Sequence, residues 1–156
     1  MGSNTISPHK NPKVLVFVGH YLPGFKSGGI LRSVENAINY LCDEFDFFVV
    51  TRNHDVGNTT PYSNVRLSQW QTVGKSRVMH LDSKLSSFSN ICTTVNLTPH
   101  DVIHLNSFFD PLSIKVLFGN KTLLFMYRDI KGMRVYLNLF NNPKTLLNRI
   151  IKEDYF

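Results

Sequence analysis

Two adjacent glycines, Gly28 and Gly29, stand between an apolar run and a stretch with helical periodicity. Residues 13–19 (KVLVFVG) are continuously apolar, which is typical of a parallel strand covered on both faces. Apolar residues then recur at helical spacing over 30–41. Glycines at such a junction leave backbone amides bare near the positive end of the helix dipole, where phosphate or another anion binds. The pair matches neither the G-x-G-x-x-G fingerprint nor a P-loop, and many glycine turns bind nothing, so both interpretations stay open.

The composition is that of an ordinary globular domain. At 156 residues with 42% hydrophobic content, the chain is long enough for one domain with a real core and is not a disordered protein. Cys42 and Cys92 lack metal-ligand spacing, so we expect reduced, buried thiols and no metal. Residues 1–12 contain no apolar core of a signal peptide, and no run approaches the roughly 20 apolar residues of a membrane span. These features favour a cytoplasmic protein.

The net charge of +6 is concentrated at the carboxyl end. Residues 115–156 hold eight basic and three acidic side chains, a net +5, which leaves +1 for residues 1–114. A basic tail can hold anionic lipid or nucleic acid by counterion release. No basic–aromatic motif accompanies it, so we favour a solvated face and expect no nucleic acid.

The remaining pattern alternates strands with helices. Three signals mark helix starts: Ser83 or Ser86 as the cap of a helix that runs to residue 97, Asp110-Pro111 before a helix over 112–118, and Asn142-Pro143 in the tail. The predicted strands after the first are 45–51, 77–81, 101–105 and 123–127; 53–64 is a long loop and 65–73 is ambiguous.

This alternation predicts an α/β domain with a Rossmann-like, doubly wound and mostly parallel sheet, and helices on both faces. We expect a disordered segment over 1–12, the domain over 13–118, and a divergent basic tail over 119–156 with a strand and a helix. In such sheets ligands bind beyond the carboxyl ends of the strands. The Gly28-Gly29 loop and Asn106-Ser107 are therefore expected on one edge, together with His20 and Tyr21.

Five colinear segments resemble the amino-terminal half of a family 4 glycosyltransferase of the two-Rossmann-domain (GT-B) type. The similarity is closest to bacterial members that build surface polysaccharides, and it covers roughly residues 13–117. The segments are 19–24 (GHYLPG), 28–36 (GGILRSVEN), 48–55 (FVVTRNHD), 61–65 (PYSNV) and 101–109 (DVIHLNSFF).

The resemblance implies the acceptor-side half of a retaining, metal-independent hexosyltransferase without a cofactor. Such an enzyme moves a sugar from a nucleotide-sugar donor to a glycan or lipid-linked acceptor in polysaccharide biosynthesis. It works in the cytoplasm, peripheral to the inner face of the membrane. The amino-terminal domain holds the acceptor, and its Gly-Gly loop approaches the donor diphosphate. The carboxyl-terminal domain grips the nucleotide sugar.

The resemblance also implies roles for individual residues. Gly28, Gly29 and Arg32 match the donor-phosphate loop and the helix that follows it. Tyr21, Asn106 and Ser107 are the implied acceptor-binding residues, of which Asn106 and Ser107 offer both donor and acceptor groups for sugar hydroxyls. His104 is the nearest candidate for the catalytic-region histidine of the family. Strand alternation also fits His104 as a structural histidine inside the domain.

The sequence departs from the family after residue 117. Residues 125–130 (FMYRDI) stand where a Pro-Arg-Gly segment is expected, and the resemblance does not extend to a donor domain. We therefore expect a truncated or frameshifted product that is inactive alone. Two alternatives stay open: a working subunit completed by a separate donor-domain chain, and a non-enzymatic module whose basic tail binds anionic lipid or nucleic acid.

Overall fold

The computed structural model describes residues 11–82, 84, 86–107, 109–119, 124–128 and 134–138. Within these residues, seven strands and three helices follow one another. In chain order they are β1 (Lys13–Phe17), α1 (Gly29–Leu41), β2 (Asp46–Arg52), β3 (Trp70–Val73), β4 (Ser76–Leu81), α2 (Phe88–Leu97), β5 (Val102–Leu105), α3 (Pro111–Gly119), β6 (Leu124–Arg128) and β7 (Arg134–Asn138).

The strands of the described residues form one sheet in the order β3-β4-β2-β1-β5-β6-β7. The five from β4 to β6 in this order run parallel, and β3 and β7 pair antiparallel at the two edges. The chain builds outward from β1 to β4 and then returns to place β5 on the other side of β1. The order therefore reverses between β1 and β5, and in doubly wound sheets this reversal opens the crevice that binds ligands. The predicted Rossmann-like α/β fold is confirmed.

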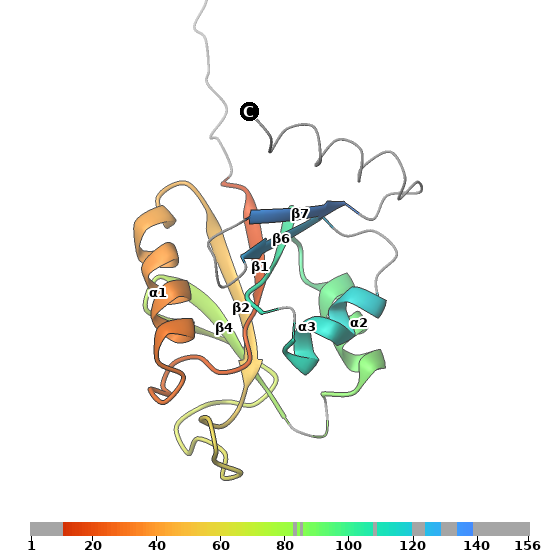
Figure 1. Cartoon of the computed structure of the whole chain (residues 1–156). Helices are drawn as coiled ribbons and strands as arrows, with labels where there is room; N and C mark the ends of the chain where they lie inside the picture. Colours follow the sequence, from red (N-terminus) through yellow and green to blue (C-terminus); the bar gives the residue numbers. More distant parts are fainter. Residues whose placement is uncertain are drawn as a thin grey trace, which may run out of the picture.

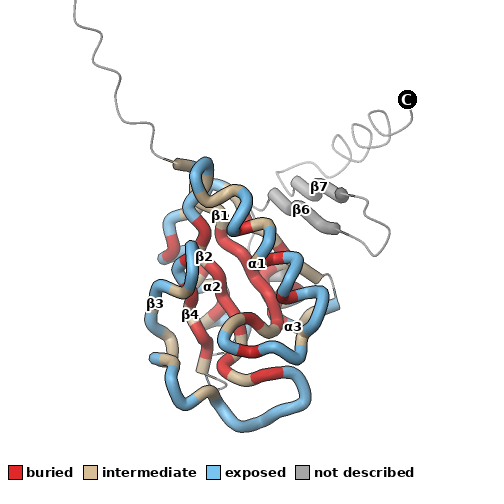
Figure 2. The backbone as a smooth tube through the Cα atoms, turned by 90° about the vertical axis from the view of Figure 1, so that its left-hand side faces the viewer, coloured by how far each residue is buried: buried red, intermediate tan, exposed pale blue. Residues whose placement is uncertain are grey.

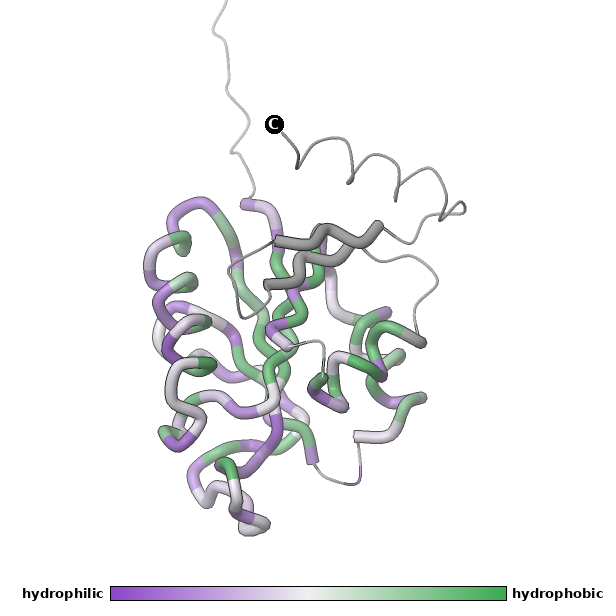
Figure 3. The backbone as a smooth tube through the Cα atoms, in the orientation of Figure 1, coloured by the Kyte–Doolittle hydropathy of each residue, from purple (hydrophilic) through white to green (hydrophobic). Residues whose placement is uncertain are grey.

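Helices cover both faces of the sheet (Figure 1). On one face α1 buries Leu31, Val34 and Ile38, in agreement with its predicted helical spacing. On the other face α2 and α3 lie side by side and bury Ile91 and Val116. The central strands β1 and β2 between these layers are mostly buried and apolar (Figures 2 and 3).

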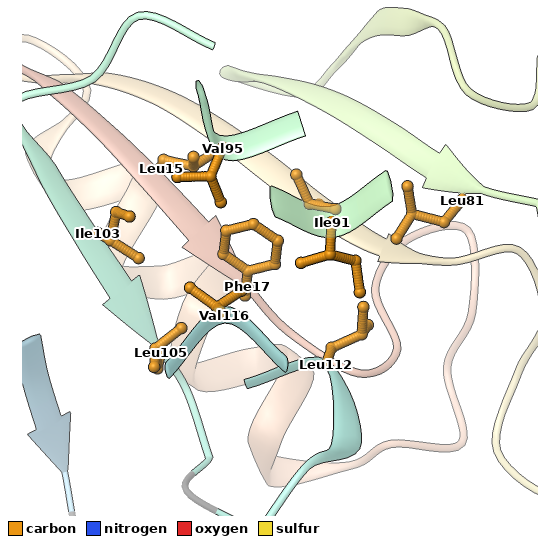
Figure 4. Packing of buried hydrophobic residues seen from close by; sticks show 10 residues of the cluster. Leu15, Phe17, Leu81, Ile91, Val95, Ile103, Leu105, Leu112 and Val116 are labelled. Carbon is orange, nitrogen blue, oxygen red and sulfur yellow. The ribbon is translucent and has the colours of Figure 1, made fainter. Parts of the chain in front are cut away.

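The central strand β1 serves both layers because successive side chains of a strand point to opposite faces. Leu15 and Phe17 belong to the cluster under α2 and α3, whereas Val16 belongs to the cluster under α1. Figure 4 shows Phe17 in the middle of its cluster, with Ile91 of α2 and Val116 of α3 beside it. Full burial of each such side chain stabilises the fold by about 1.5–3 kcal/mol, which explains why this run is continuously apolar.

Most predicted elements agree with the structure to within two residues, with a few differences. The ambiguous stretch 65–73 contains β3, an edge strand that turns into β4 through Gly74 with its φ of +58°. The cap of α2 is Ser87, whose hydroxyl accepts the Asn90 N–H. The prediction of Ser83 or Ser86 as the cap is therefore wrong by at least one residue. Asp110 caps α3 as predicted, because its Oδ1 accepts the Leu112 N–H at 2.8 Å.

The region that we separated as a tail contributes two strands to the sheet. β6 corresponds to the predicted strand 123–127, and β7 is a strand that the sequence pattern did not indicate. The expected disorder of 1–12 and the Asn142-Pro143 helix fall mainly or wholly outside the described residues. Both cysteines are free, as predicted, but only partly buried, so the prediction that they are buried is wrong. Among the described helices, none has the length and apolar character needed to cross a bilayer.

Candidate functional site

The loops that follow β1, β2 and β5 leave the sheet at its carboxyl edge, the lower end in Figure 1. There they enclose a pocket of about 430 Å³ at the point where the strand order reverses. We call it the main pocket. Its polar lining groups come from both sides of the reversal and include His20, Lys26, Ser27, Asn106 and Ser107. Concave sites at this place are the usual ligand sites of doubly wound sheets.

An ion pair joins two walls of the main pocket. Arg52, the last residue of β2, donates two hydrogen bonds to Asp110, from Nη1 to Oδ2 at 3.0 Å and from Nη2 to Oδ1 at 2.9 Å. Both side chains are largely buried, with 23% and 17% of their area exposed. The two-pronged geometry fixes both partners, because a guanidinium matches a carboxylate plane. Asp110 therefore ties the start of α3 to the end of β2.

Gly19 allows this pair to lie across the end of β1. A Cβ at Gly19 would stand 2.3 Å from Asp110 Oδ2 and 2.6 Å from Arg52 Nη1. Both distances are shorter than any van der Waals contact, so a larger residue would push the pair apart. The glycine is thus required by the close approach of the two side chains.

The tautomer of His20 follows from its two partners. Its Nδ1 lies 2.8 Å from the carbonyl oxygen of His54, which can only accept a hydrogen bond. Its Nε2 lies 3.4 Å from Arg52 Nη1, which can only donate. The proton of His20 is therefore on Nδ1, and the lone pair of Nε2 faces Arg52 Nη1. The imidazole rings of His20 and His54 pack edge to face, with centroids 5.3 Å apart.

The loop between β1 and α1 is held in shape by the buried carboxylate of Asp55. It accepts the backbone N–H groups of Phe25, Lys26 and Val56 at 2.8–3.2 Å. Burial tends to raise the pKa of Asp55, but these amides and the nearby Lys26 charge outweigh burial and hold the pKa below its ordinary value. Lys26 Nζ in turn donates to Asn58 Oδ1 at 3.2 Å. These hydrogen bonds join the β1–α1 loop to the long loop after β2.

A buried histidine of the sheet also contacts the β1–α1 loop. His80 of β4 is fully buried, and its Nε2 lies 2.8 Å from the Leu22 carbonyl oxygen. Burial lowers the pKa of His80 although the hydrogen bond to Leu22 opposes this, so the ring stays neutral and donates from Nε2. Tyr62 packs edge to face on this ring. Burial and the Asp55 charge raise the pKa of Tyr62 to about 12, which keeps its hydroxyl protonated.

The amino end of α1 lies next to the main pocket. Gly28 is its N-cap, with a φ of +55° that residues with side chains rarely adopt. Among the described residues no side chain caps this helix, and its first turn holds no acidic residue. The space that a Cβ would occupy at Gly28 or Gly29 is open to at least 4 Å. These amides are thus approachable from outside, as an anion would require.

The structure brings some of the predicted site residues together. Asn106 and Ser107 line the main pocket together with Lys26 and Ser27, and Ser27 directly precedes the Gly28-Gly29 pair. The backbone of Asn106 is fixed by its N–H, which donates to the Phe17 carbonyl at 3.1 Å. The β1–α1 loop and Asn106 therefore meet at one edge of the sheet, although Gly28 and Gly29 themselves are not among the residues that line the pocket.

None of the other predicted site residues lines the main pocket: Gly28 and Gly29 follow the lining residue Ser27, and three more are engaged elsewhere. Tyr21 is only 2% exposed and packs in the cluster under α1, where burial raises the pKa of its hydroxyl. Arg32 points outward from α1 with 74% of its side chain exposed, and it pairs with Glu35 at 3.3 Å. His104 lies within β5 beside Val16, and burial lowers the pKa of its ring.

Lys26, Arg52 and Asp110 belong to the site but were not selected from the sequence. Arg52 and Asp110 are 58 positions apart, and no local motif connects them. The signal that could have found them is topological. Arg52 ends β2, whereas Lys26 and Asp110 lie in the loops after β1 and β5, and the loops after parallel strands share one edge of the sheet.

Within the described part of the chain, no group of three or more His, Cys, Asp or Glu side chains is placed to hold a metal ion. Comparisons with models of protein families, with curated proteins and with solved structures gave no match to this chain.

Proposed function

We propose that this domain is the acceptor-binding half of a retaining glycosyltransferase. In this proposal the full reaction moves a sugar from a nucleotide-sugar donor to a glycan or lipid-linked acceptor in polysaccharide biosynthesis. The domain holds the acceptor sugar in the main pocket and offers the amides of the Gly28-Gly29 loop to the donor diphosphate.

The observation that carries the proposal is the set of side chains in the main pocket. Asn106 and Ser107 each offer a donor and an acceptor, and Lys26 adds a cationic donor. Such a mixture suits a ligand with many hydroxyl groups, each of which also donates and accepts. Phe109, which is 77% exposed, adds an apolar surface at the rim of the same pocket. The order of the five sequence segments supports the same conclusion independently.

Glycosyl transfer needs an acceptor hydroxyl held at attack distance and a leaving diphosphate whose charge is stabilised. In this proposal the main pocket meets the first requirement by holding the acceptor sugar. The approachable amides of Gly28 and Gly29 provide only part of the second. A domain that supplies one wall of a cleft binds without assembling the reacting pair, so we expect the 156-residue chain to bind saccharides and to show negligible transfer.

Titration by nuclear magnetic resonance tests the proposal, with methyl glycosides of glucose, galactose and mannose as probes. We expect at least one of them to shift the backbone amide signals of Asn106 and Ser107 in a saturable manner. Asn106→Ala should weaken that binding about tenfold, the value of one or two lost hydrogen bonds. Asn36→Ala is the matched control, since Asn36 is exposed on α1 outside the pocket. The proposal is wrong if none of the three sugars perturbs the main pocket.

A further inference from the structure

A second cavity, of about 460 Å³, lies on the far side of the loop that bounds the main pocket. We call it the side pocket. It is formed between the β1–α1 loop and the long loop after β2, and its lining includes Phe25, Lys26, Asn58, Tyr62, Ser63 and Asn64.

Two chain segments, 25–27 and 55–56, contribute residues to both pockets and therefore lie between them. We call these two segments the ridge. In the first segment Phe25 faces the side pocket and Ser27 faces the main pocket. In the second segment Asp55 and Val56 divide in the same way. Lys26 lines both pockets, so the ridge is crossed at this residue. Asp55 accepts backbone N–H groups of both segments, and these hydrogen bonds hold the two segments of the ridge together.

The side pocket combines an apolar lining, which includes Pro23, Phe25 and Pro61, with polar side chains, and its two charged groups already have partners within the protein. The Asp55 carboxylate is occupied by three backbone amides, and the Lys26 ammonium donates to Asn58. Ser63 and Asn64 are exposed and offer hydroxyl and amide groups. Neutral donors and acceptors of this kind suit hydroxyl groups better than phosphate or a cation.

Phe25 belongs to the apolar lining of the same pocket. Phe25 is 78% exposed, so its ring is accessible to a ligand in the side pocket. The C–H face of a pyranose packs on such a ring while its hydroxyls reach neighbouring polar groups. An exposed ring beside amide and hydroxyl side chains therefore matches the two-sided surface of a sugar.

We propose that the side pocket is a second saccharide subsite, so that the ligand is at least a disaccharide that spans the ridge at Lys26. One unit occupies the main pocket, and the adjoining unit lies against Phe25 with its hydroxyls toward Asn64. The assignment of the first unit rests on the proposed function, whereas the side pocket stands on its own lining.

The test compares each methyl glycoside with α- and β-linked disaccharides of glucose, galactose and mannose, titrated against the 156-residue chain. For at least one series we expect the disaccharide to bind about tenfold more tightly than its monosaccharide. Its titration should shift the amides of Phe25 and Asn64 in addition to that of Asn106. Phe25→Ala and Asn64→Ala should return the affinity to that of the monosaccharide, and Phe25→Tyr should keep the gain because it keeps the ring.

Matched controls separate the subsite from general effects. Tyr40→Ala removes an aromatic ring that is 87% exposed on α1, and Asn36→Ala removes an exposed amide from the same helix. Both should keep the tenfold gain. The subsite is disproved if disaccharides bind no more tightly than monosaccharides, or if the gain survives Phe25→Ala combined with Asn64→Ala.

The outcomes also distinguish this inference from the proposed function. Monosaccharide binding at Asn106 without a gain for disaccharides removes the subsite alone. Shifts at Phe25 and Asn64 without any at Asn106 remove the acceptor role of the main pocket and leave the subsite. Absence of binding by every sugar overturns both.

Discussion

The two ends of the sheet are built in different ways. At the amino end the chain turns back through residues 42–45 and 98–101, four residues each time. At the carboxyl end it makes the long excursions 18–28 and 53–69. Short connections need little support beyond the packed strands that they join. Long loops have backbone N–H and C=O groups that must find partners away from the regular ladder.

At the carboxyl end these partners are buried polar side chains. Asp55 binds three amides of the two long loops, His80 binds the Leu22 carbonyl, and the Arg52–Asp110 pair joins β2 to α3. The layers between the ends are held instead by apolar side chains such as Phe17 and Ile91. The sheet is therefore stabilised by burial of apolar side chains, whereas the conformation of the loops at the carboxyl end depends on a few specific hydrogen bonds.

The largest expected effect is on the apolar layers. Phe17→Ala should lower the free energy of unfolding by about 4 kcal/mol, because it opens a cavity among fully buried side chains. Urea denaturation monitored by circular dichroism measures the change. Phe17→Leu, which keeps most of the volume, should cost less than about 1.5 kcal/mol. Equal losses for both variants would contradict the packing argument.

Arg52→Ala should come next, with a loss of about 3 kcal/mol, because it leaves the mostly buried Asp110 carboxylate without its partner. Unfolding in urea again measures it. Arg52→Lys should restore only part of the loss, since an ammonium cannot make both hydrogen bonds. Lys75→Ala, at an exposed position of the opposite end, should stay within about 0.5 kcal/mol of the natural sequence. A loss no larger than that of Lys75→Ala would show that the pair is not needed at the site end.

The pH dependence of stability should reveal Asp55. Its pKa is lower in the folded state than the value of about 3.9 in the unfolded state, so the folded state binds fewer protons between the two values. Its contribution is therefore complete above about pH 4 and is lost as the pH falls through the folded pKa. Asp55→Asn should flatten this part of the curve. Urea unfolding of both proteins from pH 6 to pH 3 gives the comparison, and parallel curves would disprove the role of the carboxylate charge.

The smallest expected effects compare two neighbouring glycines at the site end. Gly28→Ala should cost about 1 kcal/mol because an alanine at a φ of +55° is strained. Gly29→Ala should be neutral or stabilising by about 0.5 kcal/mol, because Gly29 has ordinary helical geometry and open space beside it. Thermal unfolding of the two variants measures both. Equal losses would mean that the positive φ of Gly28 is not required.

The elements of this protein could largely be predicted because their signals are local. The apolar run of β1 and the helical spacing of α1 each lie within a single window, and the Asp110-Pro111 cap is a contiguous pair. The edge strand β3 was ambiguous because its pairing with β4 defines it more than its own composition. Tyr21 illustrates the same limit, since a loop position next to His20 does not reveal that its ring turns into the core under α1.

Local sequence patterns were enough to predict the order of strands and helices, the faces that they bury, and the end of the sheet where the loops of parallel strands meet. Which loops are neighbours at that end depends on the tertiary structure. The strand order places β5 beside β1 and so brings Asp110 to Arg52 and Asn106 to Lys26. The physical reason is that strand order depends on packing between distant segments, whereas each segment's own pattern specifies only its type and its buried face.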